Sequence, residues 1–188
     1  MEAFESFVSL AMESEGLLVS GPHKFKVKRV TRKTSKEEHQ THGYEVDLIG
    51  IRKDKLVLAS VKSLFGSGGV FADRVIGESP THSSQYKLIN DKPLRDEVAR
   101  QAAERFGYKL SEVELRLYAG KFSSTKHEVQ IREWCGTQLV GSGPIKVFGA
   151  KEIVASVLSE AKETQYRDNP VLATLKVLEH LSLLKPLD

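Results

Sequence analysis

The chain has 188 residues, 40% of them hydrophobic and 28% charged, with a formal net charge of +3 at pH 7. This length and composition predict one domain over 1–188 with a sizeable core, and they exclude a disordered or fibrous chain. A single cysteine, Cys135, excludes an internal disulfide, no apolar run is long enough to span a bilayer, and the first residues lack the pattern of a secretory signal, so we expect a cytoplasmic protein.

The first third of the chain predicts a helix followed by three strands. Apolar residues recur at helical spacing over 2–15. Residues 25–30 alternate apolar and basic side chains, which is typical of a half-exposed strand, and the polar residues 31–42 predict a loop. Strands at 44–51 and 56–62 follow, and the three consecutive strands predict an antiparallel meander.

The rest of the chain predicts strands that alternate with helices. Residues 63–84 are rich in glycine and serine and predict a long connection. The remaining expected elements are, in order, a helix at 92–107, a strand at 113–119, a helix at 124–139, a strand at 145–149 and helices at 150–164 and 169–184. Strands separated by helices join a sheet in parallel, so we expect a mixed α/β domain in which parallel strands extend the meander and helices flank the sheet.

The middle of the 44–51 strand carries an unusual carboxylate. Asp47 lies in the apolar run VDLIG, where a charge is costly unless it is paired. Lys62 ends the following strand, and two explanations are open. The two side chains form a partly buried ion pair, or they form a minimal site for metal-assisted phosphodiester hydrolysis, which needs oxygen ligands for a hard cation.

The order of the elements, together with Asp47 and Lys62, resembles the PD-(D/E)xK nuclease superfamily, which has the restriction-endonuclease-like fold. The resemblance covers a nuclease-like core of about 2–120 and, loosely, part of the additional strand and helices of 121–188. It implies a nuclease that hydrolyses DNA and uses Mg²⁺ or Mn²⁺ as cofactor.

The resemblance also implies roles for individual residues. Asp47 would be the main metal ligand, and Lys62 would assist the attacking water. Glu5 would add a carboxylate from the first helix, and the backbone carbonyl of Val61 would be a further oxygen ligand.

One position departs from the family pattern. The second metal-binding acid of the motif is expected two residues before the lysine, and this chain has Ser60 there. Three explanations stay open. Glu78 (or, less favourably, Asp73) in the long connection supplies the missing acid; Glu45 supplies it from the same face of the strand as Asp47; or the site has lost catalysis and the fold only binds nucleic acid or a protein partner.

A basic cluster precedes this motif. Thirteen residues from Lys24 to Lys36 contain seven basic side chains and no acid. Such a cluster would neutralise nucleic-acid phosphates, or it is the solvated edge of a strand. The candidates for nucleic-acid binding are Lys24, Lys26, Lys28, Arg29, Arg32 and Lys33.

The last predicted helix, 169–184, is rich in leucine. These leucines either pack into the core or form the seam of a homodimer, and the sequence leaves both open.

Overall fold

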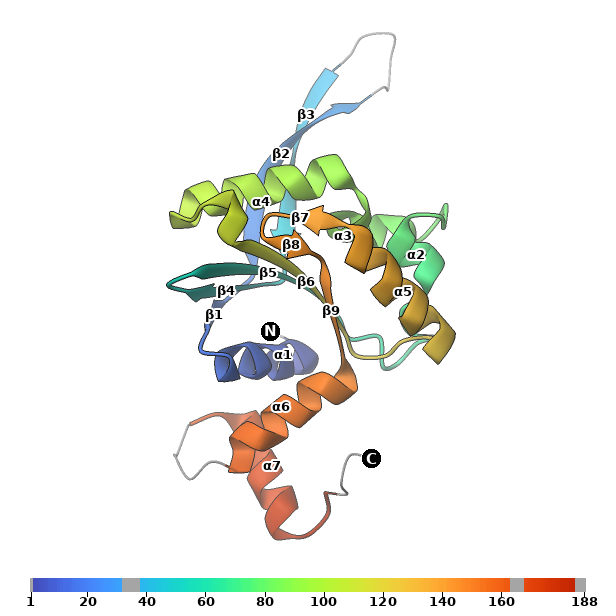
Figure 1. The fold of residues 1–188 in the computed structure, drawn as a ribbon. Helices are drawn as coiled ribbons and strands as arrows, with labels where there is room; N and C mark the ends of the chain where they lie inside the picture. The colour runs from blue at the N-terminus through green and yellow to red at the C-terminus, as the bar shows by residue number, and fades with distance from the viewer. Residues whose placement is uncertain (1, 32–37, 163–167, 185–188) are drawn as a thin grey trace.

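A five-stranded mixed sheet lies at the centre of the molecule, between two layers of helices (Figure 1). The computed structural model describes residues 2–31, 38–162 and 168–184. The strands of this sheet follow the order β1 (Leu18–Ser20), β4 (Leu48–Arg52), β5 (Lys55–Lys62), β6 (Val113–Ala119) and β9 (Lys146–Gly149). The first three are antiparallel and the last three parallel, so the predicted mixed α/β class is confirmed.

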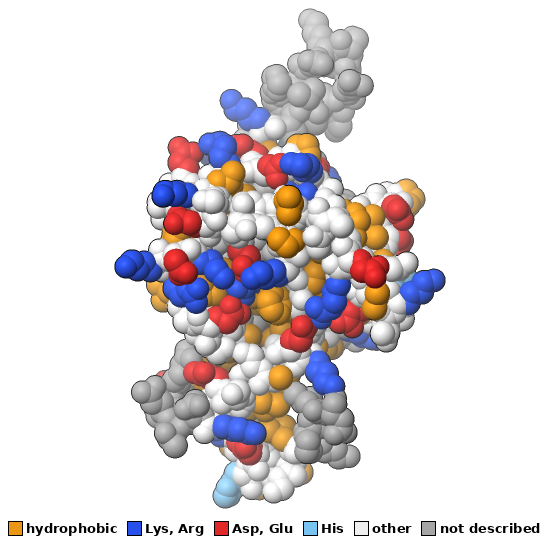
Figure 2. Space-filling view, viewed as in Figure 1, with side chains coloured by type: hydrophobic (Ala, Val, Ile, Leu, Met, Phe, Trp, Pro, Cys, Tyr) orange, Lys and Arg blue, Asp and Glu red, His pale blue; other side chains and the backbone are white. Residues whose placement is uncertain are grey.

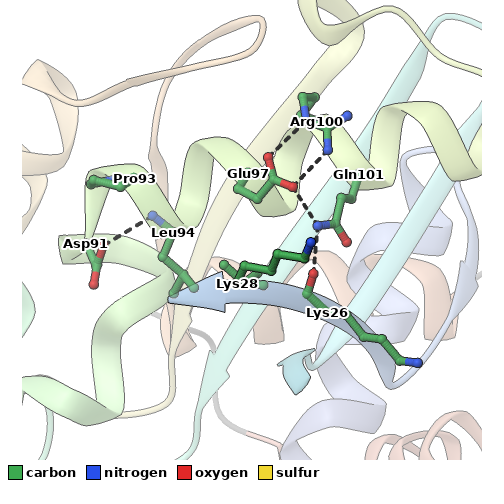
Figure 3. A pocket seen from close by; sticks show the side chains of 9 residues that line it. Lys26, Lys28, Asp91, Pro93, Leu94, Glu97, Arg100 and Gln101 are labelled. Atoms are coloured by element: carbon green, nitrogen blue, oxygen red, sulfur yellow. Dashed lines mark hydrogen bonds and ion pairs between the residues drawn. The ribbon is translucent and has the colours of Figure 1, made fainter. Parts of the chain in front are cut away.

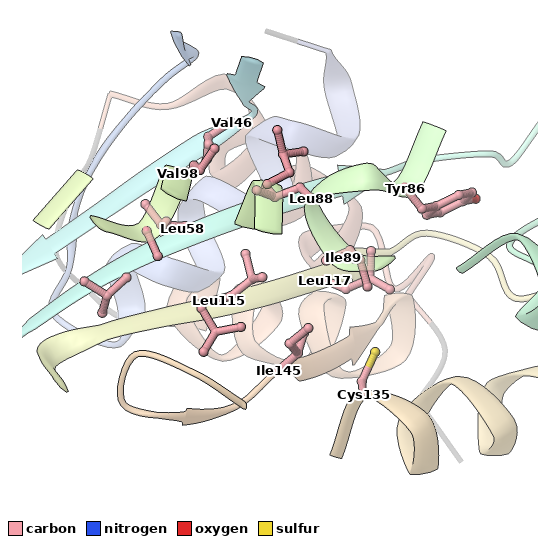
Figure 4. Close-up of a cluster of buried hydrophobic side chains, with 14 of the residues drawn as sticks. Val46, Leu58, Tyr86, Leu88, Ile89, Val98, Leu115, Leu117, Cys135 and Ile145 are labelled. Atoms are coloured by element: carbon pink, nitrogen blue, oxygen red, sulfur yellow. The ribbon is translucent and has the colours of Figure 1, made fainter. Parts of the chain in front are cut away.

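Two hydrophobic clusters cover the two faces of the sheet. One face packs against α2 (Ala72–Ile76), α3 (Lys87–Asn90), α4 (Lys92–Phe106) and α5 (Thr125–Thr137). Figure 4 shows this cluster, in which Leu58 and Leu115 of the sheet lie among Val98 of α4 and Cys135 of α5. The other face packs against α1 (Ala3–Ser14) and α6 (Ala150–Lys162), and α7 (Pro170–His180) packs in turn on α6. Along the described ranges, no helix has both the length and the apolar character needed to cross a membrane.

A long hairpin extends from this sheet. Strand β2 (His23–Thr31) pairs with β3 (Glu38–Val46) as a separate two-stranded sheet. The pairing of β1 with β4 continues in the same register into that of β2 with β3, so that two long strands form one hairpin. Its base belongs to the five-stranded sheet and its arm projects beyond it (Figure 1).

The hairpin bends where Gly21 faces Asp47. A Cβ at Gly21 would lie 2.3 Å from the backbone oxygen of Asp47, so a side chain cannot be accommodated there without movement. The bend divides the predicted strand 44–51 into β3 and β4, with Asp47 between them. Asp47 therefore lies where the arm leaves the sheet.

Two predictions for this region are wrong. The range 31–42 was expected as a loop, but its end belongs to β3. The five-stranded sheet also takes its first strand from 18–20 and not from 25–30, which lies in the arm. Strand β3 is largely polar and contributes only its last residues, Tyr44 and Val46, to the core, so it has little hydrophobic alternation from which it can be recognised.

The later elements agree closely with the predictions. Helix α4 begins after Asp91, whose carboxylate accepts a hydrogen bond from the Leu94 backbone N–H at 3.1 Å, and ends before Gly107 at φ 76°. Strand β6 covers the predicted range 113–119. The connection 63–84 holds α2 and part of a 3₁₀ turn (Ser83–Tyr86), and two short strands, β7 (Leu139–Val140) and β8 (Gly143–Pro144), precede β9.

The C-terminal leucines are divided between core and surface. Leu172 and Leu175 of α7 are buried in the cluster that includes α1 and α6, whereas Leu181, just after the helix, is exposed. Core packing therefore explains the first two. Apolar side chains are also visible on the surface of α6 and α7 in Figure 2. The homodimer stays a prediction.

Candidate functional site

Asp47 and Lys62 lie next to each other at the point where the hairpin leaves the sheet. The pairing of β4 with β5 ends at Leu48 and Ala59, because the chain before Leu48 turns away into the arm. The Asp47 carboxylate replaces the missing strand partner of β5 there, because its Oδ2 accepts a hydrogen bond from the Val61 backbone N–H at 2.6 Å. The same oxygen lies 4.0 Å from Lys62 Nζ.

The electrostatics of Asp47 are unbalanced. Its side chain is 22% exposed, and that of Lys62 is 25% exposed. Burial raises the pKa of Asp47 above its ordinary value, although Lys62 and the Val61 N–H both act to lower it. The negative charges of Glu5 and Glu45 raise the pKa further. The neighbours of Asp47 therefore stabilise its negative charge less than water would.

The first helix brings Glu5 towards this site. Its charge acts on Asp47, as noted above, and its Oε2 accepts a hydrogen bond from the Glu2 backbone N–H at 2.9 Å in the capping arrangement that begins α1. The carboxylate thus has a structural task in the helix cap, and it also contributes to the negative potential around Asp47.

The other two glutamates lie differently. Glu45 is exposed on β3 and forms an ion pair with Lys24 at 3.5 Å. The argument that Glu45 shares a face with Asp47 assumed an unbroken strand, and the strand is interrupted at Asp47 itself. Glu78 is exposed just after α2 and is not among the charges with the largest effect on Asp47. Its place in a metal site stays a prediction, as does that of Glu45.

Position 60 has no carboxylate, and the serine there is only 5% exposed. Ser60 and Lys62 lie on the same face of β5 because side chains alternate along a strand. Across the residues that the structure describes, no three His, Cys, Asp or Glu side chains gather closely enough to hold a metal ion by themselves. Any cation would need backbone, water or substrate oxygens in addition to carboxylates.

Tyr86 is a neighbour of Lys62 that the sequence did not indicate. The Lys62 ammonium lies over the Tyr86 ring, 5.9 Å from its centroid. Burial raises the pKa of the Tyr86 phenol to about 12. The ammonium therefore has both a carboxylate and the face of a neutral aromatic ring as neighbours, and the two contacts restrain its position.

The candidate nucleic-acid residues lie on the arm. Lys24, Lys26 and Lys28 follow one another on β2 at every second position, and the alternate residues Phe25 and Val27 are buried. Arg29 lies further along β2, opposite Gln40 in the pairing. Arg32 and Lys33 lie outside the described residues.

Two hollows lie between this strand and α4. The first, about 530 Å³, is lined by Lys26 and Lys28 and by α4 residues that include Glu97 and Arg100 (Figure 3). Hydrogen bonds from Arg100 and Gln101 lower the pKa of Glu97 to about 2, so this hollow carries a firm negative charge among its cations. The second, about 890 Å³, lies along the lysine row and includes Gln101 and Arg105.

Sequence reasoning did not identify Gln101 and Arg105 as neighbours of the lysine row. Both lie on α4, and their helical positions were predicted, but only the packing of the arm against α4 brings them to β2. No family model, curated protein or solved structure matches this chain.

Proposed function

We propose that the chain is a metal-dependent deoxyribonuclease of the PD-(D/E)xK type. The observation that carries this proposal is the under-compensated Asp47 carboxylate beside Lys62 at the divergence of the hairpin from the sheet. The order of helix, antiparallel strands, helix and parallel strand supports the restriction-endonuclease-like assignment of the fold.

The donor set suits a hard divalent cation. Asp47 and Glu5 are carboxylates, and the carbonyl of Val61 is a further oxygen. Mg²⁺ is usually held by one or two carboxylates with several waters and substrate phosphate, so this sparse set is sufficient in kind. When bound, the ion would polarise the scissile phosphate and lower the pKa of a bound water.

Lys62 has a separate task in this reaction. Its ammonium, restrained by Asp47 and the Tyr86 ring, would stabilise the negative charge that develops on the phosphate and orient the attacking water. Asp47 would also hold the end of β5 through the Val61 N–H, which fixes the position of the lysine that follows.

Cleavage of DNA by matched variants tests this proposal. We expect wild-type protein to cleave plasmid, linear duplex or single-stranded DNA with Mg²⁺ or Mn²⁺, and Asp47→Asn and Lys62→Met to lose at least about 100-fold of the rate, as removal of an electrostatic catalytic group does. Asp96→Asn, on the exposed surface of α4, is the control for a lost aspartate. Equal cleavage by Asp47→Asn and Asp96→Asn would refute the assignment.

A second candidate function has its own supporting observation. Ser60 stands in place of an acid, and Oδ2 of Asp47 is already occupied by the Val61 N–H, which together suit a catalytically silent module that binds nucleic acid or a protein. Calorimetric titration with Mn²⁺ separates the two functions. Nucleic-acid binding without Mn²⁺ binding, either free or in the presence of DNA, would favour the silent module.

A further inference from the structure

A trough of about 890 Å³ runs along the lysine face of the arm. It is lined by Lys24, Lys26, Lys28, Thr41, Gly43, Gln101 and Arg105. Every charged side chain in this lining is basic. The face shown in Figure 2 differs, because acidic and basic side chains are intermixed across the body of the molecule there.

Small side chains keep the trough open on the β3 side. Gly43 pairs with Lys26, and Thr41 pairs with Lys28. A Cβ placed on Gly43 would meet no atom within 4 Å, so the space beside Lys26 is empty of protein. The lysines therefore border a hollow, and their ammonium groups can converge on a ligand that lies in it.

Helix α4 closes the other side and holds the arm in place. Gln101 Nε2 donates to the backbone oxygen of Lys26 at 2.8 Å, and Arg105 donates to that of Lys24 at 3.1 Å. The Arg105 guanidinium also stacks on the Phe25 ring, 4.4 Å from its centroid. These bonds fix the backbone from which the lysines project, so the cations are spaced before any ligand binds.

We propose that this trough binds the sugar–phosphate backbone of a nucleic-acid strand without reading its sequence. Cations at every second residue of a strand repeat at about 7 Å, which suits a regularly charged, extended polyanion better than a small anion. Lysine and arginine contacts to phosphate carry position but no sequence information. The inference rests on the proposed function, since it identifies the surface on which the substrate would lie.

Glu45 limits the charge at one end of the trough. It pairs with Lys24 at 3.5 Å, and its charge also acts on Asp47, two residues further along the chain. The trough is therefore least basic at the end that leads to the candidate site. Removal of this carboxylate would release Lys24 for phosphate contact, so Glu45→Gln should bind nucleic acid more tightly.

Fluorescence anisotropy with a labelled oligonucleotide, in EDTA and over a series of salt concentrations, tests the trough. Each phosphate contact contributes about 0.9 for a duplex, or about 0.7 for a single strand, to the slope of log affinity against log salt. We expect the double variant Lys26→Gln/Lys28→Gln to reduce the magnitude of this slope by about 1.8 on a duplex, or by about 1.4 on a single strand, and to weaken binding at least tenfold at low salt. Glu45→Gln should increase the magnitude of the slope by about 0.9 on a duplex, or by about 0.7 on a single strand.

The control has the same loss of charge elsewhere. Lys53→Gln/Lys109→Gln removes two exposed lysines that do not line the trough. The same slope in both double variants would overturn the proposal, and competition by polyglutamate as strong as that by unlabelled oligonucleotide would overturn it in favour of an acidic protein partner. Since EDTA excludes metal-dependent cleavage, loss of binding and loss of cleavage are measured separately, and either proposal can fail alone.

Discussion

Two carboxylates have pKa values shifted in opposite directions: one lies within the sheet, and the other lies where the arm leaves it. Glu114, in β6, is buried with Arg116, and it also pairs with Lys146 at 2.6 Å and Lys55 at 3.4 Å. Asp47 has a single cationic partner among the described residues, Lys62 at 4.0 Å. Both groups lose hydration, but only Glu114 regains enough from cations to offset that loss.

The pKa directions express this difference. Burial acts to raise the pKa of Glu114, yet hydrogen bonds and charge from Lys146 and Arg116 bring it below its ordinary value. Burial raises the pKa of Asp47, and its neighbours do not reverse that effect. Glu114 thus has the electrostatics of a completed structural ion pair, whereas the charge of Asp47 is only partly compensated, as the proposed cation site requires.

The largest loss of stability is expected when the buried ion-pair network of Arg116 and Glu114 is broken. Arg116 donates two hydrogen bonds to Glu15, at 2.7 and 2.9 Å, and another to Glu114. Arg116→Met removes the guanidinium beside the buried Glu114, which keeps only its two lysine partners, and the two-point contact with the half-exposed Glu15, so it should lower the free energy of unfolding by about 3 kcal/mol. Arg100→Met, which removes exposed ion pairs on α4, should lower it far less, because water screens exposed pairs. Urea unfolding measures both, and equal losses would show that the buried network is not special.

A second substitution, Ser60→Asp, adds another negative charge near Asp47. Ser60→Asp places a buried carboxylate on the face of β5 that carries Lys62, and it should lower stability in EDTA by about 1–3 kcal/mol. The added ligand should also tighten cation binding. Mn²⁺ at about 100 times its dissociation constant would then return about 2.7 kcal/mol.

The matched variant Ser60→Asn adds similar bulk without the charge. Thermal unfolding with and without Mn²⁺ should show stabilisation by the ion that is larger in Ser60→Asp than in Ser60→Asn. If the ion stabilises the two variants equally, position 60 does not face the cation site.

The sequence predicts which strands lie next to each other around Asp47, but it does not predict the local geometry of Asp47. The apolar runs around Asp47 and before Lys62 require two adjacent strands, so their approach follows from pattern alone. The interruption at Asp47 does not, because it depends on the bend at Gly21 and on the pairing of β3, a largely polar strand that adds little to the core. The Arg116 network is also hidden, since VELRLYA has the pattern of a half-exposed strand although all seven residues are buried.

The smallest expected change in stability is that of Asp47→Asn, and its sign distinguishes a cation site from a structural ion pair. Because the pKa of Asp47 is raised in the folded protein, its favourable contribution is complete below 3.8 and is lost as pH rises through the folded value. Asp47→Asn should therefore match the wild type in acid and exceed its stability at pH 7, by on the order of 1 kcal/mol, since the amide oxygen can still accept the Val61 N–H.

Glu114→Gln gives the opposite slope in the same experiment. The pKa of Glu114 is lowered, so its contribution is present above 4.5 and is lost as pH falls below that value, and the variant should be less stable than the wild type at neutral pH. Chemical unfolding from pH 3 to pH 7 in EDTA compares the two variants. With a saturating divalent ion, the wild type should become more stable than Asp47→Asn at pH 7, because the ion binds the deprotonated carboxylate. The difference between the wild type and Glu114→Gln should not change. If Asp47→Asn instead loses stability at pH 7 as Glu114→Gln does, Asp47 is a structural ion pair of the same kind as Glu114, and the argument for a cation site fails.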